Sequence, residues 1–231
     1  MKVRIAKFIA DSGIASRRAA EDLIAHGAVI VNGKKIDTPI VFVDENDTII
    51  VNGKEVTKKS DTKLYAFHKP VNTMTTRADP NGRQTIYDVL PNEYKNLRYI
   101  GRLDYKTTGL LLMTNDGELA RKMTLPSSHI PRTYIATVYG DLSKLDLARR
   151  GITVRGIKYA PMKIDVIDDK HLRVEIVEGK KNEVRIVLAA VGAPVKKLHR
   201  ISFGKIDLGN LPVGKIRELG QKTIDLVLKS F

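Results

Sequence analysis

The stretch GRLDYKTTGLLLMTNDGELA, residues 101–120, decides the fold of the larger part of this chain. The polar residues RLDYKTTG lead into the apolar run GLLLMT, 109–114, which ends at the turn Asn115-Asp116-Gly117. A short apolar run bounded by turn signals predicts a strand that is buried on both faces. The residues that follow, 118–124, have a helical pattern. We therefore expect a central buried strand with a polar loop at its entrance.

The neighbouring segments add strands and helices in an irregular order. The run LYAFHK at 64–69 predicts a strand, which Pro70 stops. Further strands are predicted at 97–101, 133–139, 162–167 and 171–177, and helices at 143–150 and 183–191. Because strands and helices do not alternate steadily as βαβ units, the order indicates an α+β fold with a mixed or antiparallel sheet.

The N-terminal residues predict a smaller unit with two helices. Apolar residues recur at helical spacing within 4–12, and Ser16 is a suitable N-cap for a second helix that ends near Gly27. Two similar stretches follow, AVIVNGKKI at 28–36 and TIIVNGKEV at 48–56. Each predicts a strand, an Asn-Gly turn and a second strand. We interpret them as two hairpins of one small sheet, not as duplicated domains.

The segment TKKSDTK, 57–63, contains no apolar residue and separates the two parts of the chain. Such a segment cannot contribute to a core and is typical of a connection between domains. We therefore predict a small domain at 1–58, a linker at 59–63 and a larger domain at 64–231.

The chain has a formal net charge of +14, which is divided unevenly. Residues 1–58 contain nine Lys and Arg against eight Asp and Glu, whereas the remainder contains 31 against 18. A strongly basic chain indicates a polyanionic partner. No amphipathic basic helix or lipidation motif favours a membrane surface. The pattern therefore favours nucleic acid, with most of the excess charge in the larger domain.

Other functional classes are excluded by composition. The chain has no cysteine, so disulfides, thiolate nucleophiles and cysteine-bound zinc or iron–sulfur sites are impossible. The five histidines have no pair at metal-ligand spacing: 26, 68, 129, 171 and 199. The opening residues MKVRIAKFIADSG lack the apolar run of a signal peptide, and no stretch is long enough to span a membrane. We expect a cytoplasmic protein without a metal ion.

Asp104 is the residue around which chemistry is expected. It follows Arg102 and Leu103 in the loop before the buried strand, where neighbouring guanidinium groups would favour its ionised form. A carboxylate in such a place can act as a nucleophile or as a general base. Equally, an aspartate in a loop often serves as a turn or capping residue. From its position alone, both interpretations stay open.

The stretch that contains Asp104 closely resembles the active-site motif of RNA pseudouridine synthases. It is most similar to the branch that modifies ribosomal RNA, the RsuA/RluB type. The resemblance extends in family order over most of residues 64–219, through HKPVNTMTTR (68–77), GRQTIYDVLP (82–91), RTYIATVYG (132–140), VEGKKNEVRIVLAAVG (177–192) and VKKLHRISFGKIDLGNLPVGKIREL (195–219). The first fifty-odd residues separately resemble the αL-motif RNA-binding domain of a ribosomal small-subunit protein, which this branch typically carries.

The resemblance implies a role for five residues of the larger domain. Asp104 matches the essential catalytic aspartate, and Arg102 the arginine thought to assist base flipping or to contact phosphate. Tyr134 matches a tyrosine that stacks on the target base and helps with later proton removal. Arg185 matches the basic residue that pairs with the aspartate, and Leu198 an apolar residue beside the tyrosine. Read without the family, a tyrosine in a strand belongs to a core and a helical arginine to a surface.

Two positions depart from the family pattern. Asn182 stands where relatives often have a basic residue, and Ile186 replaces a second basic residue common there. These departures concern local RNA contacts more than the chemistry. Glu183 lies at a position that holds glutamine or glutamate in the family.

The αL-type domain is expected to hold ribosomal RNA through a basic face. Its acidic residues gather mainly at 37–55, whereas its helices and first hairpin carry the candidate phosphate contacts Lys7, Arg17, Arg18, Lys34 and Lys35. The alternative for these side chains is a merely solvated surface.

The resemblance implies conversion of a uridine to pseudouridine in ribosomal RNA, with the large subunit slightly favoured. No cofactor is required, because the reaction is an isomerisation. The route stays open between a glycal intermediate and direct attack by the aspartate. We expect a monomer that acts on ribosomal RNA, free or within an assembly intermediate. Two other classes remain as alternatives: a non-enzymatic ribosome-assembly factor, and a nuclease or glycosidase, which would need a second carboxylate or a metal cluster.

Overall fold

A computed structural model describes residues 2–56 and 61–229 of the chain. The chain divides into two compact units, Met1–Thr62 with Asn115–Gly117, and Lys63–Thr114 with Glu118–Phe231. Part of the linker predicted at 59–63 lies outside the described residues, and the domain boundaries at 58 and 64 stay predictions. No helix among the described residues is long and apolar enough to cross a membrane.

The N-terminal unit contains the two predicted helices, α1 (Ile5–Asp11) and α2 (Arg17–Ala25). Ser16 caps α2 as expected, because its side-chain oxygen accepts a hydrogen bond of 3.1 Å from the backbone N–H of Ala19. A short pair joins β1 (Val3–Arg4) to β4 (Phe42–Val43). The helices pack on a small apolar cluster that includes Ile5, Ile9 and Ile24.

The two Asn-Gly stretches form one sheet of four strands. Its order is β3 (Lys34–Lys35), β2 (Val29–Val31), β5 (Ile49–Val51) and β6 (Lys54–Glu55). Asn32 and Gly33 both have positive φ, as do Asn52 and Gly53. Two consecutive residues with positive φ define the tight turns that suit the twist of a hairpin. The prediction of two hairpins in one sheet is therefore confirmed.

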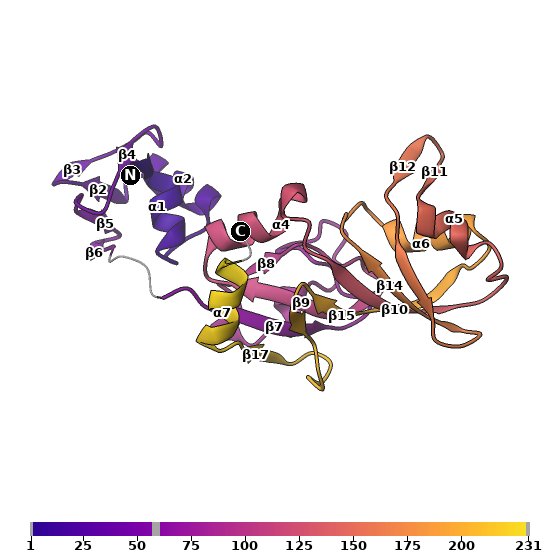
Figure 1. Cartoon of the computed structure of the whole chain (residues 1–231). Coiled ribbons are helices and arrows are strands. Elements are labelled where there is room, and N and C mark those ends of the chain that lie inside the picture. Colours follow the sequence, from indigo (N-terminus) through magenta and orange to yellow (C-terminus); the bar gives the residue numbers. More distant parts are fainter. Residues whose placement is uncertain (1, 57–60, 230–231) are drawn as a thin grey trace. The chain divides into compact units, whose positions relative to one another are not determined.

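The larger unit is built on one sheet of nine strands (Figure 1). Its main path runs through β13 (Lys163–Val166), β14 (His171–Ile176), β10 (Arg132–Val138), β15 (Val195–Phe203), β9 (Thr107–Thr114), β7 (Leu64–Lys69) and β17 (Ile216–Glu218). Two short strands flank the path: β8 (Arg98–Ile100) pairs with β9, and β16 (Ile206–Asp207) pairs with β15. All pairings are antiparallel except β15 with β9, so the predicted mixed sheet of an α+β fold is confirmed.

Helices and turns surround this sheet. They are α3 (Ile86–Val89), α4 (Gly117–Thr124), α5 (Leu145–Arg150), α6 (Glu183–Ala190), α7 (Gln221–Leu228) and the 3₁₀ turns η1 (Asn92–Tyr94) and η2 (Pro126–Ser128). Figure 1 shows α5 and α6 with the hairpin β11 (Ile152–Val154) and β12 (Ile157–Tyr159) at one end of the unit, and α7 beside β7 and β17.

The buried strand predicted from GLLLMT separates two apolar cores. Leu111 and Met113 of β9 belong to one cluster, whereas Leu110 and Leu112 belong to another. Because successive side chains of a strand point to opposite faces, such a strand must be apolar throughout.

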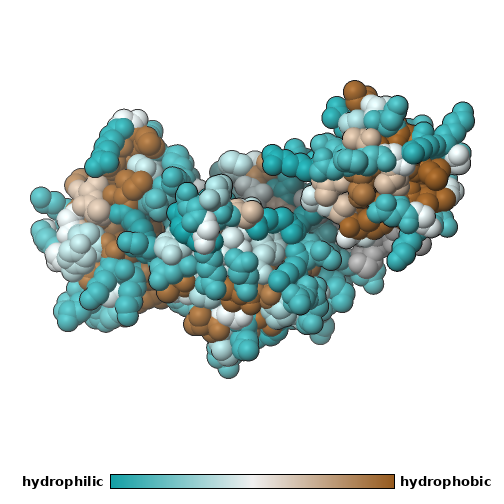
Figure 2. Space-filling view, turned by 180° about the vertical axis from the view of Figure 1, so that it is seen from behind, coloured by the Kyte–Doolittle hydropathy of each residue, from teal (hydrophilic) through white to brown (hydrophobic). Residues whose placement is uncertain are grey.

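On the face shown in Figure 2, hydrophilic residues cover most of the surface and hydrophobic ones form small separate patches.

The parallel contact of β9 with β15 joins the two halves of the sheet. Its register places Leu198 opposite Thr107 and Arg200 opposite Gly109. Gly109 has φ of +114°, and a Cβ atom there would lie 2.3 Å from the carbonyl oxygen of Arg200. Only glycine permits this approach.

Several elements have no clear signal in the sequence. The strand β15 is the longest of them, and its sequence VKKLHRISF places charged residues side by side instead of alternating them with apolar ones. The helix α7, the hairpin β11–β12 and the short strands β16 and β17 are likewise absent from the sequence-based expectation. Their existence depends on partners that are distant in the sequence.

We predict that Gly109→Ala destabilises the protein by about 3 kcal/mol or more, because the added methyl group meets the Arg200 backbone and the residue retains a strained φ. The matched control is Gly156→Ala, where φ is +77° but no atom lies within 4 Å of the added Cβ. That variant should lose only about 1–2 kcal/mol. Urea unfolding of both variants measures the difference. Equal losses would show that the contact between β9 and β15 is not tight.

Candidate active site

A cavity of about 190 Å³ lies at the entrance to β9. Four of the residues singled out from the sequence line it: Arg102, Asp104, Tyr134 and Leu198. The remainder of its wall comes mainly from the segment 179–184. The fold therefore brings together residues that lie nearly one hundred positions apart in the sequence. Arg185 does not line this cavity.

The backbone around Asp104 is held by hydrogen bonds to the segment that follows β7. Thr75 donates its hydroxyl to the carbonyl oxygen of Leu103 at 2.7 Å, and the N–H of Asn72 donates to the carbonyl oxygen of Tyr105 at 2.8 Å. A turn follows, in which the N–H of Thr107 donates to the carbonyl oxygen of Asp104 at 3.0 Å. The position of the carboxylate is thus fixed by the backbone on both sides.

Tyr134 and Leu198 reach the cavity from adjacent strands. Tyr134 of β10 pairs with Arg200 of β15, and Leu198 pairs with Ala136 two residues further along β10. Side chains two residues apart on a strand share a face. Both side chains are buried. The sheet register therefore places the aromatic ring and the aliphatic side chain near each other, and both line the cavity that Asp104 lines.

Lys69 is a buried cation near Asp104 that was not singled out from the sequence. Its ammonium group donates to the carbonyl oxygens of Pro70 at 2.8 Å and Thr107 at 2.9 Å. Burial lowers the pKa of Lys69 from 10.5 to about 8, while the negative charge of Asp104 opposes this and the positive charge of Arg200 adds to it. In the sequence, Lys69 is marked only by its place in HKPVNTMTTR, one of the stretches that carry the family resemblance.

Arg185 lies on α6 and donates to two backbone carbonyl oxygens, those of Val195 and Lys106, each at 3.0 Å. Burial lowers its pKa, and the charge of Asp104 opposes the shift. Among the described residues, no ion pair within 4.0 Å joins Arg185 to Asp104. The two charges therefore interact at longer range, and Arg185 ties α6 to the loop that carries the carboxylate.

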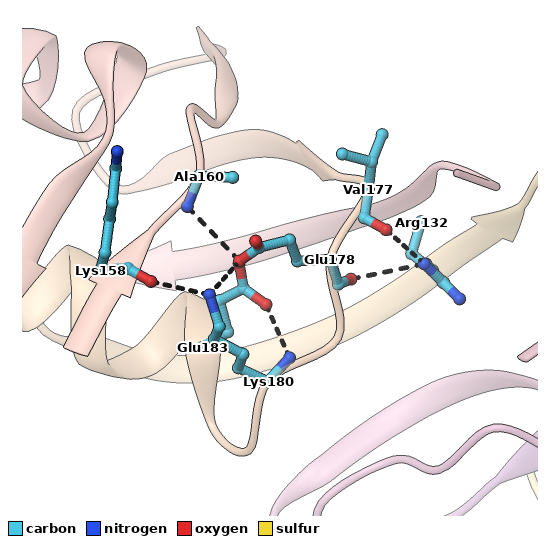
Figure 3. Close-up of polar contacts among 7 residues, drawn as sticks. All are labelled: Arg132, Lys158, Ala160, Val177, Glu178, Lys180 and Glu183. Atoms are coloured by element: carbon cyan, nitrogen blue, oxygen red, sulfur yellow. Dashed lines mark hydrogen bonds and ion pairs between the residues drawn. The ribbon is translucent and has the colours of Figure 1, made fainter. Parts of the chain in front are cut away.

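The segment 179–184 lines the same cavity, and a polar network ties it to the residues before it (Figure 3). Lys180 donates to Glu178 at 2.7 Å and to the carbonyl oxygen of Lys158 at 2.7 Å. The N–H of Lys180 donates to the carboxylate of Glu183 at 2.9 Å, and Arg132 donates to the carbonyl oxygen of Val177 at 2.7 Å. Glu183 is buried, which raises its pKa. The network holds this wall in one conformation.

Asn182 is suited to its backbone conformation. Asn182 is the N-cap residue of α6 and has φ of 55°, in the left-handed region. Asparagine tolerates this conformation better than lysine or arginine does. Asparagine at position 182 therefore suits the entry into the helix.

The five basic residues of the N-terminal unit lie on its helices and its first hairpin. Arg17 and Arg18 are exposed at the start of α2, and Lys34 and Lys35 are exposed on β3. Lys7 forms an ion pair with Asp11 at 3.4 Å. Four of the five predicted contacts thus present exposed charges, and their role in binding RNA stays a prediction.

The arrangement can perform carboxylate chemistry on a ligand that enters the cavity. Within the described residues, no side chain donates a hydrogen bond to the Asp104 carboxylate, so its oxygens are available to a ligand. Lys69 and Arg185 supply positive charge near it. Tyr134 offers an aromatic surface on which a planar base can stack.

Comparisons with known proteins match both parts of this chain to known families. The RNA pseudouridylate synthase family matches residues 63–190, and the S4 domain family matches residues 3–49. The chain is 39% identical to the ribosomal large subunit pseudouridine synthase B of Bacillus subtilis (strain 168), over 94% of this chain and 91% of that protein. It is also 39% identical to an uncharacterised RNA pseudouridine synthase of Aquifex aeolicus (strain VF5), over 100% and 95% of the two chains. A crystal structure of a pseudouridylate synthase superposes with a TM-score of 0.71 at 29% identity, covering 97% of this chain and 99% of the other.

We predict that Lys69 makes stability depend on pH. Since its pKa is about 8 in the folded chain and 10.5 in the unfolded one, the unfolded chain binds more protons between these values. The free energy of unfolding therefore rises with pH across this window, by at most about 1.4 kcal/mol per pH unit. Lys69→Met should abolish this contribution, whereas the exposed control Lys205→Met should retain it. Urea unfolding at pH 7, 8, 9 and 10 tests this, and parallel curves for wild type and Lys69→Met would refute it.

Proposed function

The chain belongs to the RNA pseudouridylate synthase family, and from this premise we propose that it converts a uridine of large-subunit ribosomal RNA to pseudouridine, with Asp104 as the catalytic carboxylate. The choice of RNA rests on the Bacillus subtilis relative, whose name specifies the large ribosomal subunit. The choice of Asp104 rests on one observation: among the described residues its carboxylate accepts no side-chain hydrogen bond, and it lines a cavity together with Tyr134, Leu198 and Arg102.

The reaction breaks the bond between N1 of uracil and C1′ of ribose and forms a bond between C5 and C1′. C5 loses its hydrogen as a proton and N1 gains one, so atoms and electrons balance without an external oxidant or reductant. Asp104 serves either as the base that removes a ribose proton, which gives a glycal, or as a nucleophile. Both routes require its carboxylate within contact distance of the nucleotide.

A uridine can reach Asp104 only after it leaves its stack. Extrusion costs a few kcal/mol, least for a nucleotide in a loop or bulge. Tyr134 recovers part of this cost by stacking on the extruded base, which is worth about 1–3 kcal/mol. Arg102 is exposed at the rim of the cavity and contacts the RNA there. Leu198 and Ile176 shield the base from water.

We propose that the active form is a monomer. Ribosomal RNA, free or in an assembly intermediate, is the proposed partner, and the cytoplasm is the proposed location. The S4 domain binds this RNA through Arg17, Arg18, Lys34 and Lys35, whose side chains project from one helix and one hairpin. These contacts fix the position of the RNA without specifying the target nucleotide.

Asp104→Asn should abolish pseudouridine formation, a loss of at least about 1,000-fold, while RNA affinity changes by less than about threefold, because the amide has the same shape but is neither a base nor a nucleophile. The measurement is pseudouridine mapping on ribosomal RNA from cells that carry the wild-type gene, the variant or neither, with RNA binding assayed in parallel. Asp165→Asn, an exposed aspartate of β13, is the matched control and should behave as wild type.

A fully active Asp104→Asn protein would overturn the assignment of the catalytic residue. Wild-type protein that restores no pseudouridine in any ribosomal RNA would instead favour a non-enzymatic role in ribosome assembly.

The double variant Arg17→Gln, Arg18→Gln should bind all RNA sequences more weakly and show a flatter dependence of affinity on salt. The slope of log K against log salt concentration should fall by about 0.7–0.9 for each phosphate that the variant no longer neutralises. Titrations at several salt concentrations give this slope, with Glu21→Gln and Asp22→Asn on the same helix as a control for altered charge. An unchanged slope in the arginine variant would mean that these side chains are only solvated.

A further inference from the structure

A second and larger cavity, of about 630 Å³, adjoins the Asp104 cavity. The two cavities share Arg102, Tyr134, Gly179 and Lys180 in their walls. The second cavity is lined in addition by Arg132, Arg200 and Phe203, none of which has a role in the proposed chemistry. A nucleotide in the first cavity can therefore extend the neighbouring part of its chain into the second.

Arg200 is buried, and only part of its guanidinium group has a hydrogen-bond partner. Only 2% of its surface is exposed, and its Nε donates to the carbonyl oxygen of Leu110 at 2.6 Å. Its Nη2 is buried and has no hydrogen-bond partner within the described part of the chain. A buried guanidinium nitrogen that lacks a hydrogen-bond partner destabilises the folded chain, because its interactions with water are lost and not replaced. Such a group on the wall of a cavity indicates a missing acceptor.

Arg132 adds a second guanidinium group to the same wall. Arg132 and Arg200 both lie over the ring of Phe203, with their central carbon atoms 4.9 and 5.3 Å from its centroid. Burial lowers the pKa of Arg132, and the proximity of Arg200 contributes to this shift. Arg132 uses one nitrogen to donate to the carbonyl oxygens of Val177 and Glu178, and the rest of its guanidinium group points away from that loop (Figure 3).

The charge of this cavity is strongly unbalanced. Four cations line it, Arg102, Arg132, Lys180 and Arg200, against the single carboxylate of Glu178, which pairs with Lys180 at 2.7 Å. Among the described residues, neither Arg132 nor Arg200 has a carboxylate within 4.0 Å. An anion with several acceptor oxygens fits such a site, and a planar guanidinium group binds phosphate through two parallel hydrogen bonds.

We propose that this cavity binds the backbone phosphate of the nucleotide next to the target uridine, with Arg200 and Arg132 as its ligands. The inference rests on the proposed function, because it takes the RNA to be threaded through the Asp104 cavity. The phosphate neutralises the charge of Arg200 and holds the chain on one side of the extruded uridine. Binding energy gained there is used to keep the uridine at Asp104.

The test uses a synthetic RNA stem-loop that contains the mapped uridine, made with a single methylphosphonate linkage either 5′ or 3′ of the target. A methylphosphonate replaces one charged oxygen of the phosphate with a methyl group. For the wild-type enzyme, one of the two linkages should lower kcat/KM by about 10–100-fold, the range of a hydrogen bond to a charged group.

The variants assign this effect to the cavity. Arg200→Gln should lower kcat/KM for the native stem-loop to a similar degree and should lose no more than about threefold further with the neutral linkage, because the contact is already absent. Arg132→Gln is the second variant. It replaces Arg200→Gln in the test if the Tm of Arg200→Gln is lowered, because a loss of activity could then reflect unfolding. Arg173→Gln removes an equal charge from the exposed side of β14, outside both cavities, and should retain the full sensitivity to the linkage.

The inference is overturned if neither neutral linkage lowers kcat/KM of the wild-type enzyme. It is also overturned if Arg200→Gln and Arg132→Gln remain as sensitive to the linkage as the wild type. Failure of the proposed function has a different signature, since the wild-type enzyme would then convert no native stem-loop at all.

Discussion

The close parallel contact between β9 and β15 is the constraint on which the rest of the larger unit depends. Antiparallel strands on either side of it form two halves of a sheet, and this single seam fixes their relative register. Gly109 makes the approach possible, because a side chain at that position would collide with the backbone of Arg200. This register brings three site residues to one cavity: Asp104 before β9, Leu198 on β15 and Tyr134 on β10.

Three cations lie near this contact between β9 and β15, of which Lys69 and Arg200 are buried and Arg185 is half-buried. Lys69 lies on the strand next to β9, Arg200 faces Gly109, and Arg185 reaches the loop before β9 from α6. Placing each cation away from water costs several kcal/mol unless it is paired. Lys69 and Arg185 recover part of this cost from backbone carbonyl oxygens and from the charge of Asp104. Arg200 recovers less of this cost, because its Nη2 has no hydrogen-bond partner in the described part of the chain. For this reason the cavity that it lines is proposed as a binding site for an anion.

The sequence predicted those parts of the fold that follow from local patterns. The buried strand at 109–114, the cap at Ser16 and the two Asn-Gly hairpins depend on neighbouring residues, and the structure confirms each of them. The strand β15 could not be predicted in this way, since VKKLHRISF has no regular alternation and is stabilised by strands from elsewhere in the chain. Among the site residues, motif resemblance singled out Asp104 and Tyr134 but assigned no role to Lys69 or Arg200. Lys69 is notable because it is buried near Asp104, and Arg200 because it is buried with an Nη2 that has no hydrogen-bond partner in the described part of the chain; only the structure shows these features.

A carboxylate is a difficult group to place against RNA, because each phosphate that approaches it is repelled. The distribution of charge in this chain answers that difficulty. Nearly all of the net charge of +14 lies outside residues 1–58. In the larger unit, Lys69 and Arg185 interact electrostatically with Asp104, and further cations line the adjoining cavity. In a site of low dielectric constant these charges act over longer distances than in water. The excess of cations therefore allows one negative side chain to meet a polyanion. The two adjoining cavities then serve different parts of the same nucleotide chain, because the neutral base is received beside the carboxylate and the charged backbone beside the arginines.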